Sequence, residues 1–321
     1  MDEEEVLSEG KVEEDTEEGH EEEEDQLMVC HLTKETIAEG LSLLARTGNG
    51  LSHAFVRLDL TDKGLTDITA ISSYVHIRFL DLSKNHLTDL SPLASLTHLL
   101  WLKMDSNAVA CFKGQPLGQL TYLQWLSVAM NQLKDLEGLV GPALESLNVI
   151  GNSIQRVNGL QYRHLTNLVT LELRGNRLDT TDGIYLPNLR QLFLADNGIK
   201  RLEGLDRLEC LDTLHLRDNQ LETLDGISPN MKCLKYLNVR GNMILSQNAL
   251  QVLGCLSNTL RTLVLAENPL AETENYRLLV LAHLPQLERL DKDPISSEER
   301  TEAHSRVNEL KEEEVPDPED F

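Results

Sequence analysis

One apolar pattern recurs along most of this 321-residue chain. The pattern is Leu-x-x-Leu-x-Leu-x-x-Asn-x-Leu, and it occurs ten times at intervals of 21 to 26 residues. Its asparagine position holds Lys63 in the first copy and then Asn85, Asn107, Asn131, Asn152, Asn176, Asn197, Asn219, Asn242 and Asn268. A repeat of about 20–30 residues cannot bury its apolar side chains alone, so successive copies have to stack into a solenoid.

Each copy contains a short segment in which inward and outward side chains alternate. In the copy at 168–178, Leu171 and Leu173 are expected to point into the core, while their neighbours point outward. The asparagine at the end of the strand can pair with backbone groups that would otherwise be buried without partners. Apolar residues then recur at every third position, for example across 199–211, which suits 3₁₀ or short helical turns. The sequence therefore predicts an α/β leucine-rich-repeat solenoid of about ten repeats, with a parallel concave sheet and a helical convex side.

Both ends of this solenoid require caps, because a terminal repeat has only one neighbour to cover it. Thr33 is the predicted N-cap of a helix over 34–46, which would end at the glycine-rich segment 47–50. A second cap is predicted at 276–291. The sequence thus predicts one solenoid domain over residues 30–295.

Two segments interrupt the repeat period. Residues 110–118, with Gly114 and Pro116, are expected to form a loop after the third repeat. Residues 245–259 carry apolar side chains at helical spacing and predict a fuller helix on the convex side. Both are interpreted as structural features, although insertions in solenoids often lie on binding faces.

A charged segment, residues 296–321, follows the solenoid. It opens with a capping box, Ser296-Ser-Glu-Glu299, which predicts a helix to about residue 314. Because the helix is so polar, it is not expected to fold against its own domain. It is either a solvated helix or a docking helix ordered by a partner, and Val307 and Leu310 on its thin apolar stripe are then candidate partner-binding residues.

Charge is distributed unevenly along the chain. Of the net charge of −24, residues 1–25 contribute −14 and residues 296–321 contribute −7, which leaves a nearly neutral solenoid. The N-terminal tail, residues 1–29, is expected to be disordered, and is either solubilising or an electrostatic contact for a basic partner surface. Nucleic-acid binding is not expected, because nothing in the chain would displace the counterions of a phosphate backbone.

Other signals indicate an intracellular protein. The N-terminus is acidic without a following apolar segment, and no stretch approaches the ~20 apolar residues of a membrane helix, so neither secretion nor membrane insertion is expected. There is no Asn-x-Ser/Thr glycosylation acceptor. The five cysteines lack a Cys-x-x-Cys pair and are interpreted as reduced core thiols.

The sequence contains no motif for catalysis, nucleotide binding or metal binding. Its ten histidines are scattered, and only His215 is expected on the concave face. We therefore expect no enzyme activity, no cofactor, no metal and no small-molecule substrate.

Outward side chains at the third position of each repeat form a row along the concave face. This row includes Phe79, Trp101 and Trp125 on three neighbouring repeats, and the chain has no other tryptophan. Adjacent strands lie about 4.8 Å apart, so the three rings can form one ladder. Large aromatic side chains dominate many protein interfaces. The ladder, together with Lys103, is therefore a candidate partner-binding surface; the alternative is that the rings only stack and cover the sheet.

A second candidate surface follows on the same face. Arg174, Arg217 and Arg240 occupy the seventh position of their repeats, and His215 and Tyr236 lie nearby. This cluster could receive an acidic or polar segment of a partner, or the tail of the chain itself. The alternative is a set of surface charges that neutralise one another, with His215 an ordinary surface histidine.

Several stretches beyond the generic repeat pattern resemble one family. These stretches are residues 40–51, 85–93, 96–103, 214–219 and 284–292. They resemble the leucine-rich-repeat radial-spoke proteins of motile cilia and sperm flagella over roughly 33–295. The repeat length and the C-terminal cap are similar to those of the intracellular leucine-rich-repeat subclass with repeats of about 22 residues, which phosphatase regulators typify.

The resemblance implies a non-enzymatic structural subunit of the axonemal radial spoke, in the cytoplasm and cytoskeleton of cilia and flagella. It implies binding to other radial-spoke proteins, at the spoke head or at a neighbouring spoke, and a role in ciliary and sperm motility. Two other functions stay open. One is a regulatory subunit that binds a protein phosphatase on the concave face, and the other is an acidic binder of basic proteins.

Overall fold

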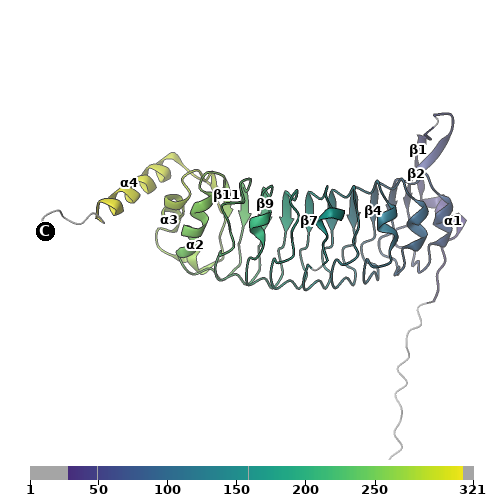
Figure 1. Ribbon diagram of the computed structural model, residues 1–321, viewed down its shortest axis with the longest axis horizontal. Helices are drawn as coiled ribbons and strands as arrows, with labels where there is room; N and C mark the ends of the chain where they lie inside the picture. Colours follow the sequence, from purple (N-terminus) through teal and green to yellow (C-terminus); the bar gives the residue numbers. More distant parts are fainter. Residues whose placement is uncertain (1–27, 49, 158, 314–321) are drawn as a thin grey trace, which may run out of the picture.

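The computed structural model describes residues 28–48, 50–157 and 159–313, except for the side chains of 306–313. The strands are β1 (Leu41–Arg46), β2 (His53–Asp59), β3 (Phe79–Asp81), β4 (Trp101–Lys103), β5 (Trp125–Ser127), β6 (Ser146–Asn148), β7 (Thr170–Glu172), β8 (Gln191–Phe193), β9 (Thr213–His215), β10 (Tyr236–Asn238), β11 (Thr262–Val264), β12 (Arg289–Leu290) and β13 (Asp293–Pro294). They form one sheet in sequential order, and the repeats stack into an elongated row (Figure 1). The strands from β2 to β12 are parallel, as predicted, whereas β1 and β13 pair antiparallel at the two ends.

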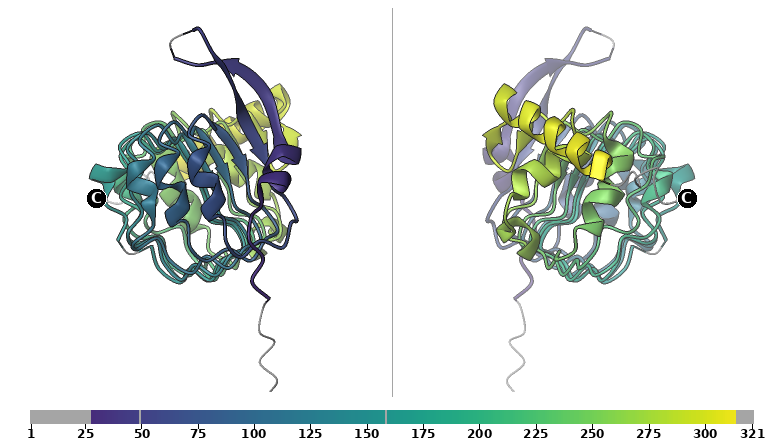
Figure 2. Two further views of the ribbon diagram at one scale, coloured as in Figure 1. Left: turned by 90° about the vertical axis from the view of Figure 1, so that its right-hand side faces the viewer. Right: turned by 90° about the vertical axis from the view of Figure 1, so that its left-hand side faces the viewer.

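Short helical turns lie on the side of most repeats opposite the sheet, as Figure 2 shows when viewed along the row. The α-helices are α1 (Lys34–Gly40), α2 (Asn248–Leu253), α3 (Tyr276–His283) and α4 (Ser297–Glu313). The 3₁₀ helices are η1 (Thr69–Ser73), η2 (Ser91–Ser95), η3 (Pro116–Gln119), η4 (Tyr162–His164), η5 (Leu205–Arg207), η6 (Gly254–Leu256) and η7 (Pro269–Glu272). The predicted 3₁₀ turns are thus confirmed, as is the helix within 245–259. The predicted loop at 110–118 gives way to η3 at Pro116 and is fixed by the buried ring of Phe112.

Leucine side chains of successive strands fill the space between the sheet and these turns. Leu80, Leu102 and Leu126 are in register on β3 to β5, and each is at most 1% exposed. Leu171 and Leu173 are fully buried, as the alternation predicts. Because each leucine packs against its counterparts in the adjacent repeats, the core is one continuous column that no single repeat could form.

A ladder of asparagine amides joins each repeat to the one before it. The Asn107 Nδ2 donates to the carbonyls of Leu82 and Met104, at 2.9 and 3.1 Å, and its Oδ1 accepts from the Leu87 amide at 3.0 Å. The same arrangement recurs as far as Asn268, which donates to Val239 and Leu265. These amides satisfy buried backbone groups of two repeats at once, which explains why one residue type recurs at this position.

The residue before each of these positions adopts a left-handed backbone conformation in all ten repeats, a feature that the sequence reading missed. Glycine occupies it in three repeats, as at Gly175 (φ 65°), and other residues occupy it in seven, with φ between 54° and 59°. Met130 is one of them (φ 54°). The turn that orients the asparagine therefore needs a conformation that most residues adopt at a cost of about 1–2 kcal/mol.

The predicted N-terminal helix over 34–46 is wrong in its second half. Thr33 is the N-cap, and its Oγ1 accepts from the Thr36 amide at 3.2 Å. However, α1 ends at Gly40, where a Cβ atom would lie only 2.2 Å from the Asp59 carbonyl oxygen. Residues 41–46 instead form β1, which pairs antiparallel with β2. Pairing with β1 satisfies the backbone hydrogen-bonding groups along the free edge of β2. A helix over residues 41–46 would leave them without partners.

The capping box predicted for the C-terminal helix is confirmed. The Ser296 amide donates to the Glu299 carboxylate at 2.8 Å, and the Glu299 amide donates to the Ser296 hydroxyl at 3.2 Å. The expectation that α4 does not fold against its own domain is wrong for its first turns. Arg277 pairs with Glu299 at 2.6 Å, Arg300 donates to two carbonyls of the preceding turn, and Ala303 is 3% exposed.

The cysteines form no disulfide among the described residues, but they are not core thiols. Cys111, Cys233 and Cys255 are exposed, and Cys30 and Cys210 are partly buried. Cys210 and Cys233 each precede a buried leucine, so the leucine takes the inward position and the thiol stays at the surface. Of the tail predicted at residues 1–29, residues 1–27 lie outside the described part of the chain.

Candidate partner-binding surface

The outward side chains of strands β2 to β11 form a surface here called the concave face. Trp101 and Trp125 are in register on β4 and β5, and their rings stack with centroids 4.7 Å apart and an interplanar angle of 6°. Phe79 is in register with Trp101 on β3. All three side chains are only partly buried. We call these three residues the aromatic ladder, and the structure places them side by side as predicted.

Lys103 points outward beside the aromatic ladder. Its Nζ lies 3.7 Å from the Asp105 carboxylate. Asp105 also accepts from the Ser127 hydroxyl at 2.5 Å and from the Ala129 amide at 3.0 Å. Asp105 is therefore fixed across two repeats, and it holds the lysine ammonium at the border of the ladder.

A second aromatic stack lies on strands β8 to β10. The His215 ring is stacked between Phe193 and Tyr236, with centroids 4.8 Å away on each side. The sequence reading placed His215 and Tyr236 near each other but missed Phe193. Phe193 occupies the fifth position of its repeat, whereas the predicted row of aromatic residues follows the third position. Reading the fifth position as a row would have found Phe193 beside His215.

Burial sets the protonation of this stack. Desolvation lowers the pKa of His215, and the positive charge of Arg174 lowers it further. Burial also raises the pKa of Glu172, although Arg174, 3.3 Å away, acts in the opposite direction. His215 is therefore a neutral, stacked ring at neutral pH and not an ordinary surface histidine.

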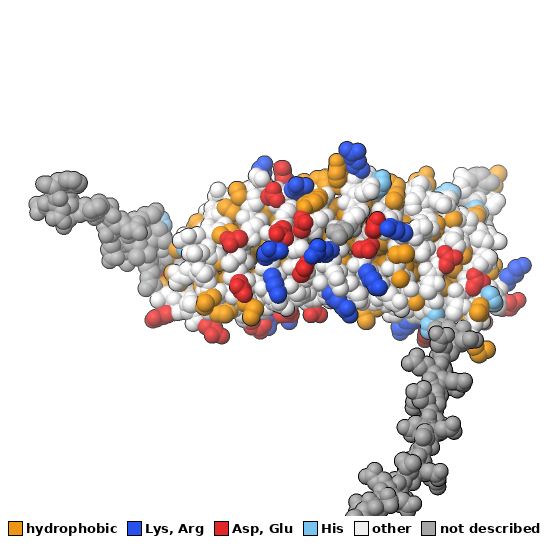
Figure 3. Space-filling view, turned by 60° about the horizontal axis from the view of Figure 1, so that its bottom comes forward, with side chains coloured by type: hydrophobic (Ala, Val, Ile, Leu, Met, Phe, Trp, Pro, Cys, Tyr) orange, Lys and Arg blue, Asp and Glu red, His pale blue; other side chains and the backbone are white. Residues whose placement is uncertain are grey.

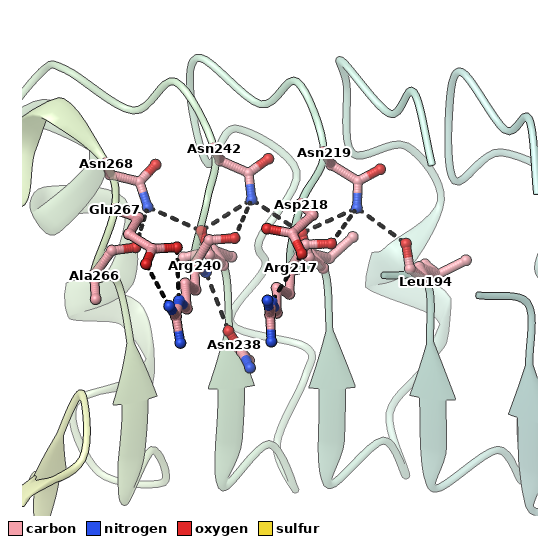
Figure 4. Close-up of polar contacts among 12 residues, drawn as sticks. Leu194, Arg217, Asp218, Asn219, Asn238, Arg240, Asn242, Ala266, Glu267 and Asn268 are labelled. Carbon is pink, nitrogen blue, oxygen red and sulfur yellow. Dashed lines mark hydrogen bonds and ion pairs between the residues drawn. The ribbon is translucent and has the colours of Figure 1, made fainter. Parts of the chain in front are cut away.

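The arginines predicted for this second surface already have carboxylate partners. Arg217 contacts Asp218 at 2.8 Å, and the Arg240 Nε lies 2.7 Å from Glu267 (Figure 4). Arg174 contacts Glu172 on its own strand end. Arg174, Arg217 and His215 line a shallow hollow of 570 Å³ whose lining also includes Phe193, Asp196 and Asn238, whereas Tyr236 and Arg240 lie outside it. We call this region the arginine–aromatic cluster; its charges are largely neutralised within the molecule.

The two regions lie on one face but do not merge. Strand β6 separates them and presents the small side chains of Ser146 and Asn148. Three strand spacings, roughly 14 Å, separate β5 from β8. A partner that contacts both regions has to span this distance along the sheet. Val307 and Leu310 belong to α4, but their side chains lie outside the described part of the structure, so their role stays a prediction.

Charges elsewhere on the repeat body are mixed. Figure 3 shows acidic and basic side chains interspersed over the face that it presents, without a large area of one sign. Among the described residues, no group of three or more His, Cys, Asp or Glu side chains is placed to hold a metal ion. No helix in the described ranges combines the length and apolar character needed to cross a membrane.

Comparison with known proteins identifies both the repeat and its relatives. A family model described as leucine-rich repeat matches residues 146–316. The human leucine-rich repeat-containing protein 23 is 48% identical over 288 residues, which cover 90% of this chain and 83% of the human protein. The Xenopus tropicalis protein of the same name is 49% identical, with coverage of 89% and 81%, and the mouse protein is 46% identical, with coverage of 91% and 85%.

Solved structures with the same fold are more distant in sequence. An internalin (InlF) from Listeria monocytogenes has a TM-score of 0.50 at 19% identity and covers 81% of this chain and 90% of its own. A chain in the complex of Latrophilin 3, Unc5D and FLRT2 has a TM-score of 0.53 at 20% identity, with coverage of 68% and 81%. These similarities establish the leucine-rich-repeat fold alone. Identity of nearly one half over most of both sequences is a closer relation, and by it the chain belongs to the leucine-rich repeat-containing protein 23 family.

Proposed function

We propose that this protein is a non-enzymatic scaffold of the axonemal radial spoke in motile cilia and flagella. It binds other radial-spoke proteins and links the spoke to its head or to a neighbouring spoke. The resemblance of the chain to radial-spoke proteins supports this role, and membership of the leucine-rich repeat-containing protein 23 family agrees with it. Its place in the cell is then the axonemal cytoskeleton, and its contribution is to ciliary and sperm motility.

The aromatic ladder is the observation that carries the binding part of this proposal. Trp101 and Trp125 present one stacked apolar surface on a face where the neighbouring strand offers only small polar side chains. Tryptophan buries a large area at a low entropy cost, because it has only two side-chain torsions. A partner that covers the two rings desolvates a preformed surface, which is the usual property of an interface hot spot.

In this proposal, three segments of the chain have separate roles. The solenoid, residues 30–295, provides a rigid face on which partners are held at fixed spacing. The C-terminal segment, residues 296–321, contacts a second spoke protein through Val307 and Leu310, since its first turns are anchored by Arg277 and Glu299. The N-terminal tail, residues 1–29, contributes mainly negative charge.

The arginine–aromatic cluster contributes in a different way. Because Arg217 and Arg240 are already paired with carboxylates, a strongly acidic partner would have to displace those carboxylates first. A segment with both polar and aromatic groups fits the hollow better, by contacting the Phe193 ring and hydrogen bonding to Asn238. This cluster therefore selects and orients the partner, and the ladder provides most of the affinity.

Proximity labelling of the tagged full-length protein in motile ciliated cells tests the proposed function. Enrichment of radial-spoke proteins is the expected result. Enrichment of a protein phosphatase catalytic subunit without axonemal proteins would contradict the proposal and favour a regulatory subunit. Enrichment of basic proteins that disappears when residues 1–25 are removed would favour an acidic binder of basic proteins.

A further inference from the structure

The hairpin formed by β1 and β2 has exposed apolar side chains that the concave face does not explain. Leu44 and Phe55 are paired across the two strands and are 59% and 45% exposed, and Leu51 near the tip is 87% exposed. The hairpin projects beyond the body of the solenoid at its N-terminal end (Figures 1 and 2). Among the described residues, no strand pairs with the outer edge of β1. Exposed apolar side chains on an open sheet edge indicate a surface that another segment covers.

A hollow lies between this hairpin and the next repeats. It has a volume of 340 Å³, and Ala45, Ala54 and Val56 form its apolar part. Its polar part consists of Thr47 and of the basic and imidazole side chains of Arg46, His76, Arg78 and His98. Within the described ranges, no aspartate or glutamate lines it. We call the hairpin and this hollow together the hairpin site.

Unlike those of the arginine–aromatic cluster, the arginines of the hairpin site form no ion pair with a described carboxylate. Arg46, Arg57 and Arg78 are exposed, and none forms an ion pair with another described residue. Asp59 is the one carboxylate on β1 and β2, and it accepts from the Thr61 amide at 3.0 Å. Three arginines without an ion pair to a described residue thus lie at one end of a chain whose net charge is −24. Their positive charge is complementary to an acidic segment with a few apolar residues.

We infer that the acidic N-terminal segment of this same chain, residues 1–27, binds the hairpin site. Residues 1–25 carry a net charge of −14 and include three apolar residues at 6, 7 and 12. The segment joins the described chain at Met28, directly before α1 and at the same end of the solenoid as the hairpin. Twenty-seven residues span up to about 90 Å when extended, which exceeds the distance needed. Tethering gives the segment a high effective concentration, so even weak contacts hold it in place.

This contact covers the hairpin next to the aromatic ladder. Arg57 is in register with Phe79, so the hairpin continues the concave face directly from the first ring of the ladder. A partner that approaches the ladder from the N-terminal end has to displace the acidic segment or bind beside it. This contact forms within one chain and does not depend on the radial-spoke role.

Zero-length carbodiimide crosslinking of the full-length chain tests this inference. The variant Arg78→Lys places an amine in the hollow and keeps its charge, and mass spectrometry then identifies carboxylates linked to residue 78. Arg190→Lys is the matched control, because Arg190 is also exposed, has no ion pair with a described residue and occupies the same repeat position five strands away. Lys84, exposed in the same repeat as Arg78, is the internal control for general proximity to the tail.

We expect links between residue 78 and residues 1–27 to exceed those to residue 190 or Lys84 by about tenfold. They should be lost between 50 and 500 mM NaCl, because exposed ion pairs are screened over about 4 Å at the higher salt concentration. Equal linking at all three amines would overturn the inference. So would links that form only between molecules in a mixture of ¹⁵N-labelled and unlabelled chains, which would assign the site to a second copy.

Discussion

The aromatic ladder and the arginine–aromatic cluster lie on the same sheet but present different chemistry. In the ladder, Trp101 and Trp125 stack in parallel, and charged side chains such as Lys103 and Arg57 lie at its border. In the cluster, two rings enclose a partly buried imidazole, and each arginine is paired with a carboxylate. The rings of the ladder therefore remain available to a partner, whereas the charged groups of the cluster are largely engaged in contacts within the molecule. The difference shows that a row of large side chains is better evidence for a binding surface than a row of charges.

Loss of the asparagine ladder should have the largest effect, because both regions depend on it. Asn107→Ala lies beneath the aromatic ladder, and Asn219→Ala lies beneath the arginine–aromatic cluster. Each removes an amide that pairs with three or more buried backbone groups, so each should lower the free energy of unfolding by roughly 3 kcal/mol. Urea unfolding measures this change. Asn188→Ala is the control, because that amide is exposed and donates to one carbonyl, and its effect should stay below about 1 kcal/mol.

Similar losses of unfolding free energy for Asn107→Ala and Asn219→Ala would show that the same scaffold supports both surfaces, so that the two regions differ only in their outward side chains. A loss below about 1 kcal/mol for either variant would show that the amide is replaceable by water, contrary to this account.

The contact between the two tryptophans is expected to have a smaller effect on stability. A double-mutant cycle of Trp101→Ala and Trp125→Ala should give a coupling energy of about 1 kcal/mol, which is typical of stacked aromatic pairs. The same cycle with Trp101→Ala and Tyr236→Ala should be additive, because these residues do not touch. Chemical unfolding of the single and double variants measures both cycles. A coupling near zero for the tryptophan pair would mean that the ladder is not preformed.

Acidification should weaken the arginine–aromatic cluster and leave the ladder unchanged. The pKa of His215 is lowered in the folded state by burial and by Arg174, so the unfolded chain binds the proton more tightly. Stability contributed by the neutral ring is present above the unfolded pKa of about 6.5 and is lost as the pH falls below it. Between pH 7.5 and 5.5, the wild-type chain should lose more stability than His215→Gln, as measured by urea unfolding at each pH. An equal loss in both proteins would show that His215 does not contribute.

The sequence allowed most of the fold to be predicted, because its constraints repeat. Each asparagine and each inward leucine is set by contacts with the adjacent repeat, so one copy predicts the next. The N-terminal hairpin was mispredicted for the opposite reason. Leu41 and Leu44 have helical spacing, and their pairing with Leu58 and Phe55 depends on a strand more than ten residues away. Local spacing alone cannot distinguish the two structures.

The candidate sites were predicted less completely than the fold. The aromatic ladder follows from position alone, because strand register brings the third residues together. The stack of Phe193, His215 and Tyr236 combines the fifth position of two repeats with the third position of the next, so its geometry depends on side-chain conformations. Which carboxylates pair with Arg217 and Arg240 also depends on side-chain conformations. A pattern gives the face on which a side chain lies, but not its partner.

The most direct test of the binding role uses the double variant Trp101→Ala and Trp125→Ala in the full-length chain. Radial-spoke proteins that copurify with the tagged protein from motile ciliated cells are quantified, and thermal unfolding confirms that the variant is folded. Tyr162→Ala is the control, since Tyr162 is an aromatic residue 48% exposed on η4, away from the concave face. We expect copurification to fall by about tenfold or more in the double variant and to be unchanged in the control. Undiminished copurification by the folded double variant would contradict the binding role.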